Sequence, residues 1–156
     1  MLSRQLQRLN VSKVIASLGS PILYMEPFSI KKKDLDRISV GSLIRLGRRR
    51  PALYIGVDGS VVAGAELVLD GDREVLLVTP SPEESFVSDS GSPKKEVVEI
   101  KITTISRSDI VRGRSIVFDW PLRESMILYR RGRYFALSEL LYCEGEWYLR
   151  ITETVS

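Results

Sequence analysis

Residues 52–69 read ALYIGVDGSVVAGAELVL, two β-prone segments joined by Asp58-Gly59. An Asp-Gly pair between such segments is the strongest short-range signal for a two-residue hairpin, because both central positions of a type I′ turn need a positive φ. A second turn at Asp70-Gly71-Asp72 is followed by EVLLV at 74–78. The sequence therefore predicts a three-stranded meander over residues 52–78.

A second meander is predicted near the C-terminus. Residues 97–102, VVEIKI, alternate with period two, as a half-buried strand does. Further strands are expected at 126–129, 133–142 and 147–151, with turns at Arg131-Gly132 and Glu144-Gly145. Helix is expected only at 3–16 and, as a short turn, at 32–37. The fold class is therefore all-β with minor α content, including a short N-terminal helix.

The two meanders match each other at a fixed offset of 73 residues. Gly59, Ala63, Glu66, Leu67, Leu76 and Thr79 fall on Gly132, Ala136, Glu139, Leu140, Leu149 and Thr152. With a one-residue slip, residues 38–46 also match residues 110–118. Shared β-alternation is the competing explanation, but it does not require the same Gly, Ala, Glu and Thr at one offset. We interpret the chain as two tandem modules.

Residues 79–95 read TPSPEESFVSDSGSPKK and predict a flexible linker, because three prolines, five serines and few apolar residues cannot form a core. The predicted organisation is an N-terminal helix with the first module over 1–79, a linker over 80–95 and the second module over 96–156. A linker of this length is long enough for the two modules to pair within one chain, although pairing between chains is an open alternative.

Composition argues against catalysis. Histidine is absent and Cys143 is the single cysteine, so the commonest general base and the usual zinc ligands are missing. Asp70 and Asp72 are explained by turn chemistry, and the further oxygen ligands of a calcium loop do not follow them. We expect no enzymatic activity, no metal and no cofactor. The lone cysteine and the lack of a signal-like or 18-residue apolar segment predict a cytoplasmic protein.

Charge is distributed unevenly along the chain. Residues 1–50 contain 11 Lys/Arg and 3 Asp/Glu, whereas residues 51–100 contain 3 and 10. A basic N-terminal region is compatible with nucleic acid, an acidic protein or an anionic lipid face, or with a solvated surface. The runs at Lys31–Lys33, Arg48–Arg50 and Arg130–Arg133 are likewise explained either by anion binding or by solvated turns.

Each half of the chain resembles the SPOA domain of flagellar motor-switch proteins of the FliM and FliN type and of type III secretion ring proteins. The resemblance lies in ISVGSLIRL at 38–46, IGVDG at 55–59, GAELVL at 64–69 and the ending LRITETV at 149–155. It implies two short β-meanders intertwined into a small barrel-like pseudo-dimer. It also implies a structural or adaptor role in a cytoplasmic ring, peripheral to the inner membrane as part of a basal-body complex. There is no room for the signal-receiving regions of the larger switch proteins, so a direct chemotaxis role is not expected.

The resemblance also suggests a site, since SPOA barrels use the strand after the repeated glutamate to hold a peptide of an export-ATPase regulator. Consecutive apolar residues there indicate either a core strand covered on both faces or an exposed partner surface. The candidate partner-binding residues are Leu67, Val68 and Leu69 in the first module and Leu140, Leu141, Tyr142, Tyr134 and Phe135 in the second. Alternation places Tyr134 and Phe135 on opposite faces, so one of them is expected to be an exposed anchor.

The expected partners are other ring or switch proteins and the export-ATPase regulator, with homo- or hetero-oligomers open. Nucleic acid is not expected as a partner, and no membrane insertion is expected. The alternative is a β-barrel nucleic-acid-binding module that uses the basic N-terminal region and aromatic stacking platforms. Affinity for single strands that falls steeply with salt would favour this alternative. The sequence leaves the apparatus, the partner and the role of residues 1–20 open.

Overall fold

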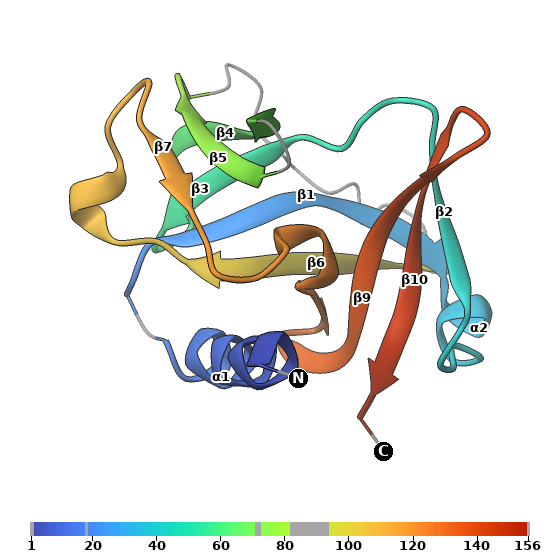
Figure 1. The fold of residues 1–156 in the computed structure, drawn as a ribbon. Coiled ribbons are helices and arrows are strands. Elements are labelled where there is room, and N and C mark those ends of the chain that lie inside the picture. The colour runs from blue at the N-terminus through green and yellow to red at the C-terminus, as the bar shows by residue number, and fades with distance from the viewer. Residues whose placement is uncertain (1, 18, 71–72, 82–93, 156) are drawn as a thin grey trace.

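The computed structural model describes residues 2–17, 19–70, 73–81 and 94–155 (Figure 1). Its helices are α1 (Leu2–Ala16) and α2 (Lys32–Leu35), with 3-10 turns at Arg107–Asp109 and Leu122–Glu124. The strands are β1 (Ile22–Lys31), β2 (Leu43–Gly47), β3 (Leu53–Val57), β4 (Ser60–Asp70), β5 (Arg73–Thr79), β6 (Lys95–Thr104), β7 (Ser115–Val117), β8 (Met126–Arg130), β9 (Arg133–Cys143) and β10 (Glu146–Thr154). The described chain is mostly β, and the predicted helices and meander strands are present.

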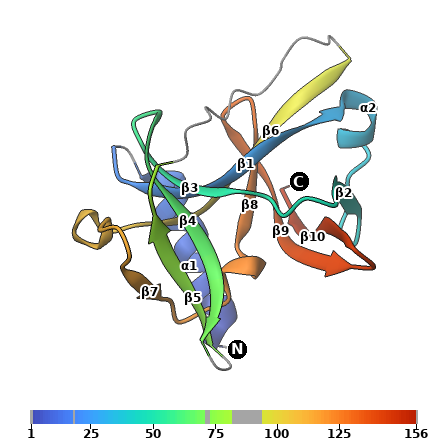
Figure 2. The ribbon, with the colours of Figure 1, turned by 90° about the horizontal axis from the view of Figure 1, so that it is seen from above.

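All ten strands form one antiparallel sheet in the order β2-β10-β9-β8-β6-β1-β3-β4-β5-β7. The expected barrel is wrong, because closure would require β2 to pair with β7, and these strands lie at opposite ends of the order. The sheet is instead strongly bent, with β3–β5 and β8–β10 forming two arms on either side of β1 and β6 (Figure 2). Both arms contribute to one core.

The order of the strands mixes the two halves of the chain, defined here as residues 2–81 and 94–155. Strand β1 pairs with β6 at the centre of the sheet. Strand β2 leaves the first half and pairs with β10, while β7 leaves the second half and pairs with β5. Residues 82–93, most of the expected linker, lie outside the described residues, and β6 begins at Lys95. The two halves are therefore joined through three interfaces between strands.

The main core lies on the inner face of the bent sheet. Its fully buried members come from both halves, among them Leu23, Ile55 and Leu76 from the first and Ile100 and Leu149 from the second. A smaller cluster forms where α1 covers the outer face of β8 and β9, through Val14, Ile127, Tyr129 and Leu137. The buried amide of Asn10 fixes α1 in place, donating from Nδ2 to the Ile102 carbonyl at 2.8 Å and accepting from Thr103 Oγ1.

The hairpin turns have the backbone that their sequences predict. Asp58 and Gly59 have φ of 48° and 83°, and Arg131 and Gly132 have 50° and 75°. Such positive values are required by a type I′ turn and are unfavourable for residues with a Cβ, which explains glycine at the second position. Of the predicted turn at residues 70–72, Gly71 and Asp72 lie outside the described residues.

Sequence patterns predict no strand at β1, β2 or β7, and of these β1 lies at the centre of the sheet. It contains Pro27, and proline inside a run normally indicates an edge strand or none, because it cannot donate to the ladder. Here the register between β1 and β6 shifts between Met25 and Phe28, so Pro27 lies at an irregularity. The neighbouring Glu26 still donates its backbone N–H to Ala52 O at 2.9 Å. A bulge therefore allows proline in a strand that is paired on both sides.

Tyrosines line the outer face of the sheet beside α1. Tyr24 and Tyr54 stack with their ring centroids 5.2 Å apart, and Tyr24 lies across Gly56, where a Cβ would be 3.0 Å from its ring. Lys101 Nζ lies 4.5 Å from the centre of the Tyr129 ring. Burial raises the pKa of Tyr54 and of Tyr129 to about 12, with a smaller effect from neighbouring tyrosines and Glu99.

These raised pKa values predict a loss of stability at alkaline pH. The phenols of the unfolded chain ionise near a pKa of about 10. The contribution of the two buried neutral phenols to stability is therefore complete below pH 10 and is lost as the pH rises to about 12. The free energy of unfolding should therefore fall over this interval, and less in a Tyr54→Phe/Tyr129→Phe variant. Urea titrations at each pH measure the difference. Absorbance titration showing every tyrosine ionising near pH 10 would contradict the assignment.

Candidate partner-binding surface

The structure places the candidate residues of β4 and β9 in different environments. Leu67 and Leu140 are buried in the main core, and Val68 and Leu141 are half-buried. The side chain of Leu69 lies outside the described residues. Tyr142 is 58% exposed. Among the described candidates, only Tyr142 is available to a partner without rearrangement.

Tyr134 and Phe135 do lie against different clusters, as alternation predicts. Tyr134 packs on the smaller cluster beneath α1, and Phe135 packs on the main core. Both are half-buried, so neither is the exposed anchor expected from the sequence. The reason is tertiary, because α1 covers the face that would otherwise have left Tyr134 open.

The exposed aromatic residue lies instead at the end of the β9–β10 hairpin. Tyr142 and Trp147 are register partners, and their rings are tilted by 49° with centroids 4.8 Å apart. Trp147 packs partly on the main core, so the pair continues the inner apolar face to the surface. The hairpin geometry thus gives Tyr142 a rigid support while leaving its ring accessible.

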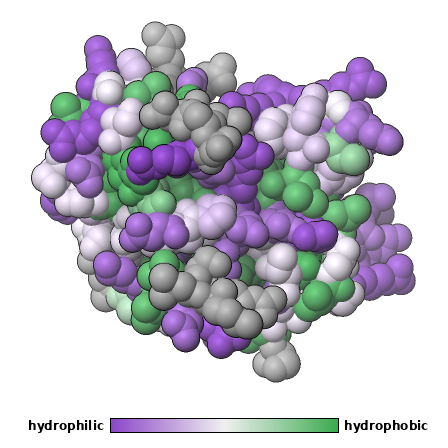
Figure 3. Space-filling model, viewed as in Figure 1, coloured by the Kyte–Doolittle hydropathy of each residue, from purple (hydrophilic) through white to green (hydrophobic). Residues whose placement is uncertain are grey.

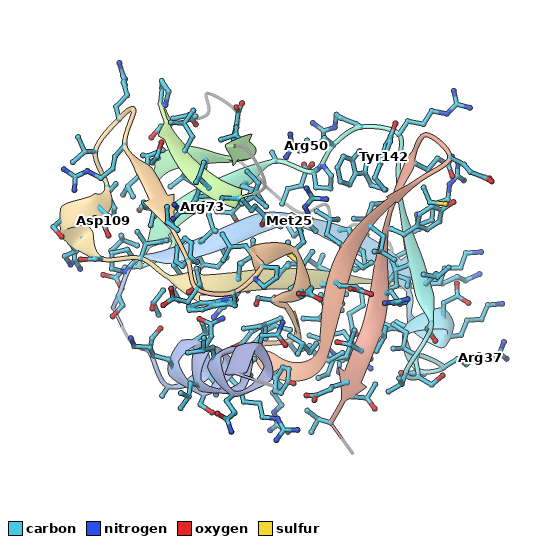
Figure 4. All side chains as sticks on the ribbon, in the orientation of Figure 1. Met25, Arg37, Arg50, Arg73, Asp109 and Tyr142 are labelled. Atoms are coloured by element: carbon cyan, nitrogen blue, oxygen red, sulfur yellow. The ribbon has the colours of Figure 1, made fainter. Side chains whose placement is uncertain are left out.

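Arg50 completes this surface from the connection between β2 and β3. Its Cζ lies 5.8 Å from the centre of the Trp147 ring, within the range of a cation–π interaction. Its Nη2 also donates to the Leu67 carbonyl at 2.7 Å. Arg50 therefore links the β10 arm to β4 across the opening between the arms, where Figure 4 shows it near Tyr142. We call Arg50, Tyr142 and Trp147 the aromatic surface.

Paired charges border the aromatic surface. Arg45 makes a bidentate ion pair with Glu146, and Tyr148 donates its hydroxyl to Glu146 Oε2 at 2.9 Å. The hydrogen bonds from Arg45 and then from Tyr148 lower the pKa of Glu146. Arg49 is bonded to Glu26, with Nη2 2.8 Å from Oε2. Within the arginine run, Arg49 and Arg50 therefore have structural contacts, whereas Arg48 is exposed and has neither an ion pair nor a hydrogen bond among the described residues.

Figure 3 shows how polarity is distributed on this face of the molecule. Apolar side chains gather over β3–β5 and beside β9 and β10, separated and bordered by charged ones. The first half has a shallow pocket of about 330 Å³, lined in part by Arg50, Leu53, Glu66 and Leu67. A larger groove of about 870 Å³ lies between α1 and the strands β9 and β10, where Glu139 is paired with Arg150.

Sequence patterns identified Tyr142 but not the part taken by Arg50. Its contact with Trp147 joins residues 97 positions apart, and no local pattern indicates such a contact. No group of three or more Cys, Asp or Glu side chains suited to a metal ion occurs among the described residues. None of the described helices is long and apolar enough to cross a bilayer.

No family model matches the chain, and no curated protein matches it.

Proposed function

We propose that the protein is a two-module SPOA-type adaptor of a cytoplasmic ring, either a flagellar motor switch or a type III secretion apparatus. In this proposal it catalyses no reaction and holds its protein partners at the aromatic surface. The observation that carries the proposal is the internal symmetry of the strand order. Exchanging β1–β5 with β6–β10 reverses the order of the sheet and leaves it otherwise unchanged.

The element bounds support two copies of one unit. Strands β1, β3 and β4 become β6, β8 and β9 when 73 is added to each residue number. Strands β2 and β7 begin 72 residues apart, which is the one-residue slip seen in the sequence match. The central pair β1 and β6 was not part of that match, so its agreement with the same offset is independent support.

Hydrogen bonds at the exchanged strands repeat in both halves. The N–H of Gly41 donates to Ile151 O at 2.8 Å, and the N–H of Gly113 donates to Val78 O at 2.9 Å. The return bonds, from Ile151 N–H to Ser42 O and from Val78 N–H to Arg114 O, are both 2.9 Å long. Gly41 and Gly113 have φ of 92° and 83°, a region that favours glycine. Two unrelated meanders would have no reason to repeat these details.

Because each half provides the edge strand of the other, we propose that one chain forms the complete intertwined unit. A single three-stranded meander leaves edges open and buries little apolar area. Exchange of β2 and β7 covers the edges of β10 and β5. This physical need explains why the modules occur in tandem.

The place where the halves differ supports a partner site in the second module. Shifted by 73, Arg50 and Trp147 correspond to Arg123 and Glu74, which form an ion pair with Nε and Oε2 3.2 Å apart. One end of the pseudo-symmetric sheet therefore has an aromatic surface and the other a salt bridge. Aromatic residues and arginine are the commonest energetic centres of protein interfaces, whereas a surface ion pair contributes little.

Partner capture tests this assignment. Tyr142→Ala should weaken binding of the captured ring or export component by at least about tenfold, since truncating a central aromatic anchor typically costs about 2 kcal/mol. Arg50→Ala should also weaken it, because Arg50 supports the face of Trp147. The matched control is Arg123→Ala, at the corresponding position of the other half. Partners are identified by mass spectrometry on bacterial lysate, and affinities are then measured with the purified partner.

The outcomes separate the proposal from its alternative. Equal effects of Arg50→Ala and Arg123→Ala would contradict the assignment to the second module. Recovery of nucleic acid, without any ring or export component, would favour the nucleic-acid-binding alternative. Light scattering on the same sample measures whether the capturing species is a single chain.

A further inference from the structure

We propose that a second surface, the basic end, docks on an anionic phospholipid bilayer. The basic end comprises Lys31, Lys32, Lys33, Arg37, Lys95 and Arg133. It lies at the start of β9, whereas Tyr142 lies at the opposite end of that strand. At about 3.4 Å per residue the two surfaces are about 30 Å apart, so this inference does not depend on the proposed function.

Tertiary structure assembles the basic end from segments far apart in the sequence. Lys31 and Lys95 are register partners at one end of the central strand pair, and Lys32 N–H donates to the Lys94 carbonyl at 2.9 Å. The start of β6 therefore lies beside α2, as Figure 2 also shows. Three lysines of the first half thus meet a lysine that follows them by more than 60 residues.

Arg130 ties the β8–β9 hairpin to the same end. Its Nη1 lies 3.2 Å from Asp36 Oδ1, just after α2, and its Nε lies 2.7 Å from Glu96 Oε2. Because Arg130 is the register partner of Arg133, this contact brings Arg133 to the basic end. Figure 4 shows Arg37 pointing away from the body of the protein at this end.

The local carboxylates offset these cations only in part. Asp36 is paired with Arg130, and Asp34 is exposed within α2. Glu96 is only 7% exposed and is occupied by Arg130 and by Arg131, whose Nε lies 3.0 Å from Oε1. Within the described part of the chain, none of the six side chains of the basic end has a carboxylate within salt-bridge distance. Six unpaired cations in one region attract a polyanion, and the attraction weakens with salt.

The composition of the basic end favours a bilayer over nucleic acid. Four of its six members are lysines, which act as point charges, whereas arginine forks and aromatic platforms are the usual means of binding nucleic acid. No exposed aromatic residue lies among the six members of the basic end. The helix at this end, α2, has only four residues. Clusters of four to eight basic residues are typical of surfaces that bind anionic lipids.

An exposed apolar side chain close to the basic end supports the same occupant. Val40, three residues after Arg37 in the chain, is 64% exposed. Apolar side chains next to lysines allow shallow contact with the acyl boundary, which adds to the electrostatic attraction. Duplex DNA offers no comparable apolar region to such side chains.

Flotation with vesicles of phosphatidylcholine and phosphatidylserine tests the proposal on the full chain. The protein should float with these vesicles and stay unbound with pure phosphatidylcholine. High salt should release most of the bound protein and leave a smaller fraction held by apolar contact. Lys31→Gln/Lys33→Gln/Lys95→Gln should weaken binding about 100-fold, because each lysine near an anionic surface contributes about 1 kcal/mol. Val40→Ser should reduce the fraction that remains bound at high salt.

The matched control is Lys13→Gln/Arg48→Gln/Arg112→Gln, which removes the same charge from exposed positions elsewhere. It should bind as the unchanged chain does, and circular dichroism checks that both triple variants are folded. Equal losses in the two variants would overturn the proposal, since attraction would then follow net charge alone. Binding of a duplex DNA without flotation on vesicles would overturn it in favour of nucleic acid.

Discussion

Neither half of the chain should fold as a monomer when it is expressed alone, and the two halves should fold when they are mixed. Residues 94–156 lack β1, β2 and β5, which are the partners of β6, β10 and β7. Residues 1–81 lack the same three interfaces from the other side. Each fragment is also small enough that its share of the main core is insufficient, since short chains bury too little apolar surface to offset conformational entropy.

Far-UV circular dichroism and light scattering measure this expectation. Each fragment alone should give a disordered spectrum or a self-paired dimer, and an equimolar mixture should recover the spectrum of the full chain as a one-to-one complex. The covalent connection between the halves only raises their effective concentration. The mixed fragments should therefore form the complex although residues 82–93 are missing. A folded monomeric half would show that the exchanged strands are dispensable.

Leu149→Ala and Leu76→Ala should each destabilise the protein by about 2–5 kcal/mol, the range for deleting most of a buried leucine side chain. Both leucines have no exposed surface, and they correspond to each other at the offset of 73. Leu149 is the register partner of Ile44 on β2, and Leu76 that of Ile116 on β7. Each substitution thus opens a cavity beside an exchanged strand.

Chemical denaturation measures both variants, with Val117→Ala as the control because Val117 is 49% exposed on β7. We expect a single cooperative transition in every case, shifted to lower denaturant for the two core variants. The reason is that both leucines belong to one core filled from both halves. Two separate transitions, one sensitive to Leu76 and the other to Leu149, would show that the halves unfold independently.

Local patterns were sufficient for most strands and turns. Alternation located β6, and the Asp-Gly, Arg-Gly and Glu-Gly pairs located three hairpins, because turn chemistry and side-chain period act over a few residues. The same locality explains why β1 was missed. Pro27 disfavours a strand unless a bulge occurs at the right register, and that register is provided by β6, more than 60 residues further along the chain.

The candidate site likewise depends partly on local sequence patterns and partly on tertiary structure. The sequence indicated Tyr142 as a candidate residue, and the hairpin turn that follows it determines that it meets Trp147 on the neighbouring strand. Local patterns could not predict which of these aromatic side chains is exposed. Tyr134 and Phe135 are covered by α1 and by the main core, whereas Tyr142 is not. Arg50 was visible only as one of three arginines, with nothing to distinguish it from its neighbours.

By itself, therefore, the sequence determined an all-β chain whose two similar meanders have type I′ turns at fixed positions. Tertiary structure alone decided that β2 and β7 change places, that the sheet stays open at both ends, and that six cations from distant segments share one end. The physical reason is the distance along the chain over which each preference acts. Turn and strand preferences are properties of a few adjacent residues, whereas edge pairing and surface charge depend on which segments the shared core brings together.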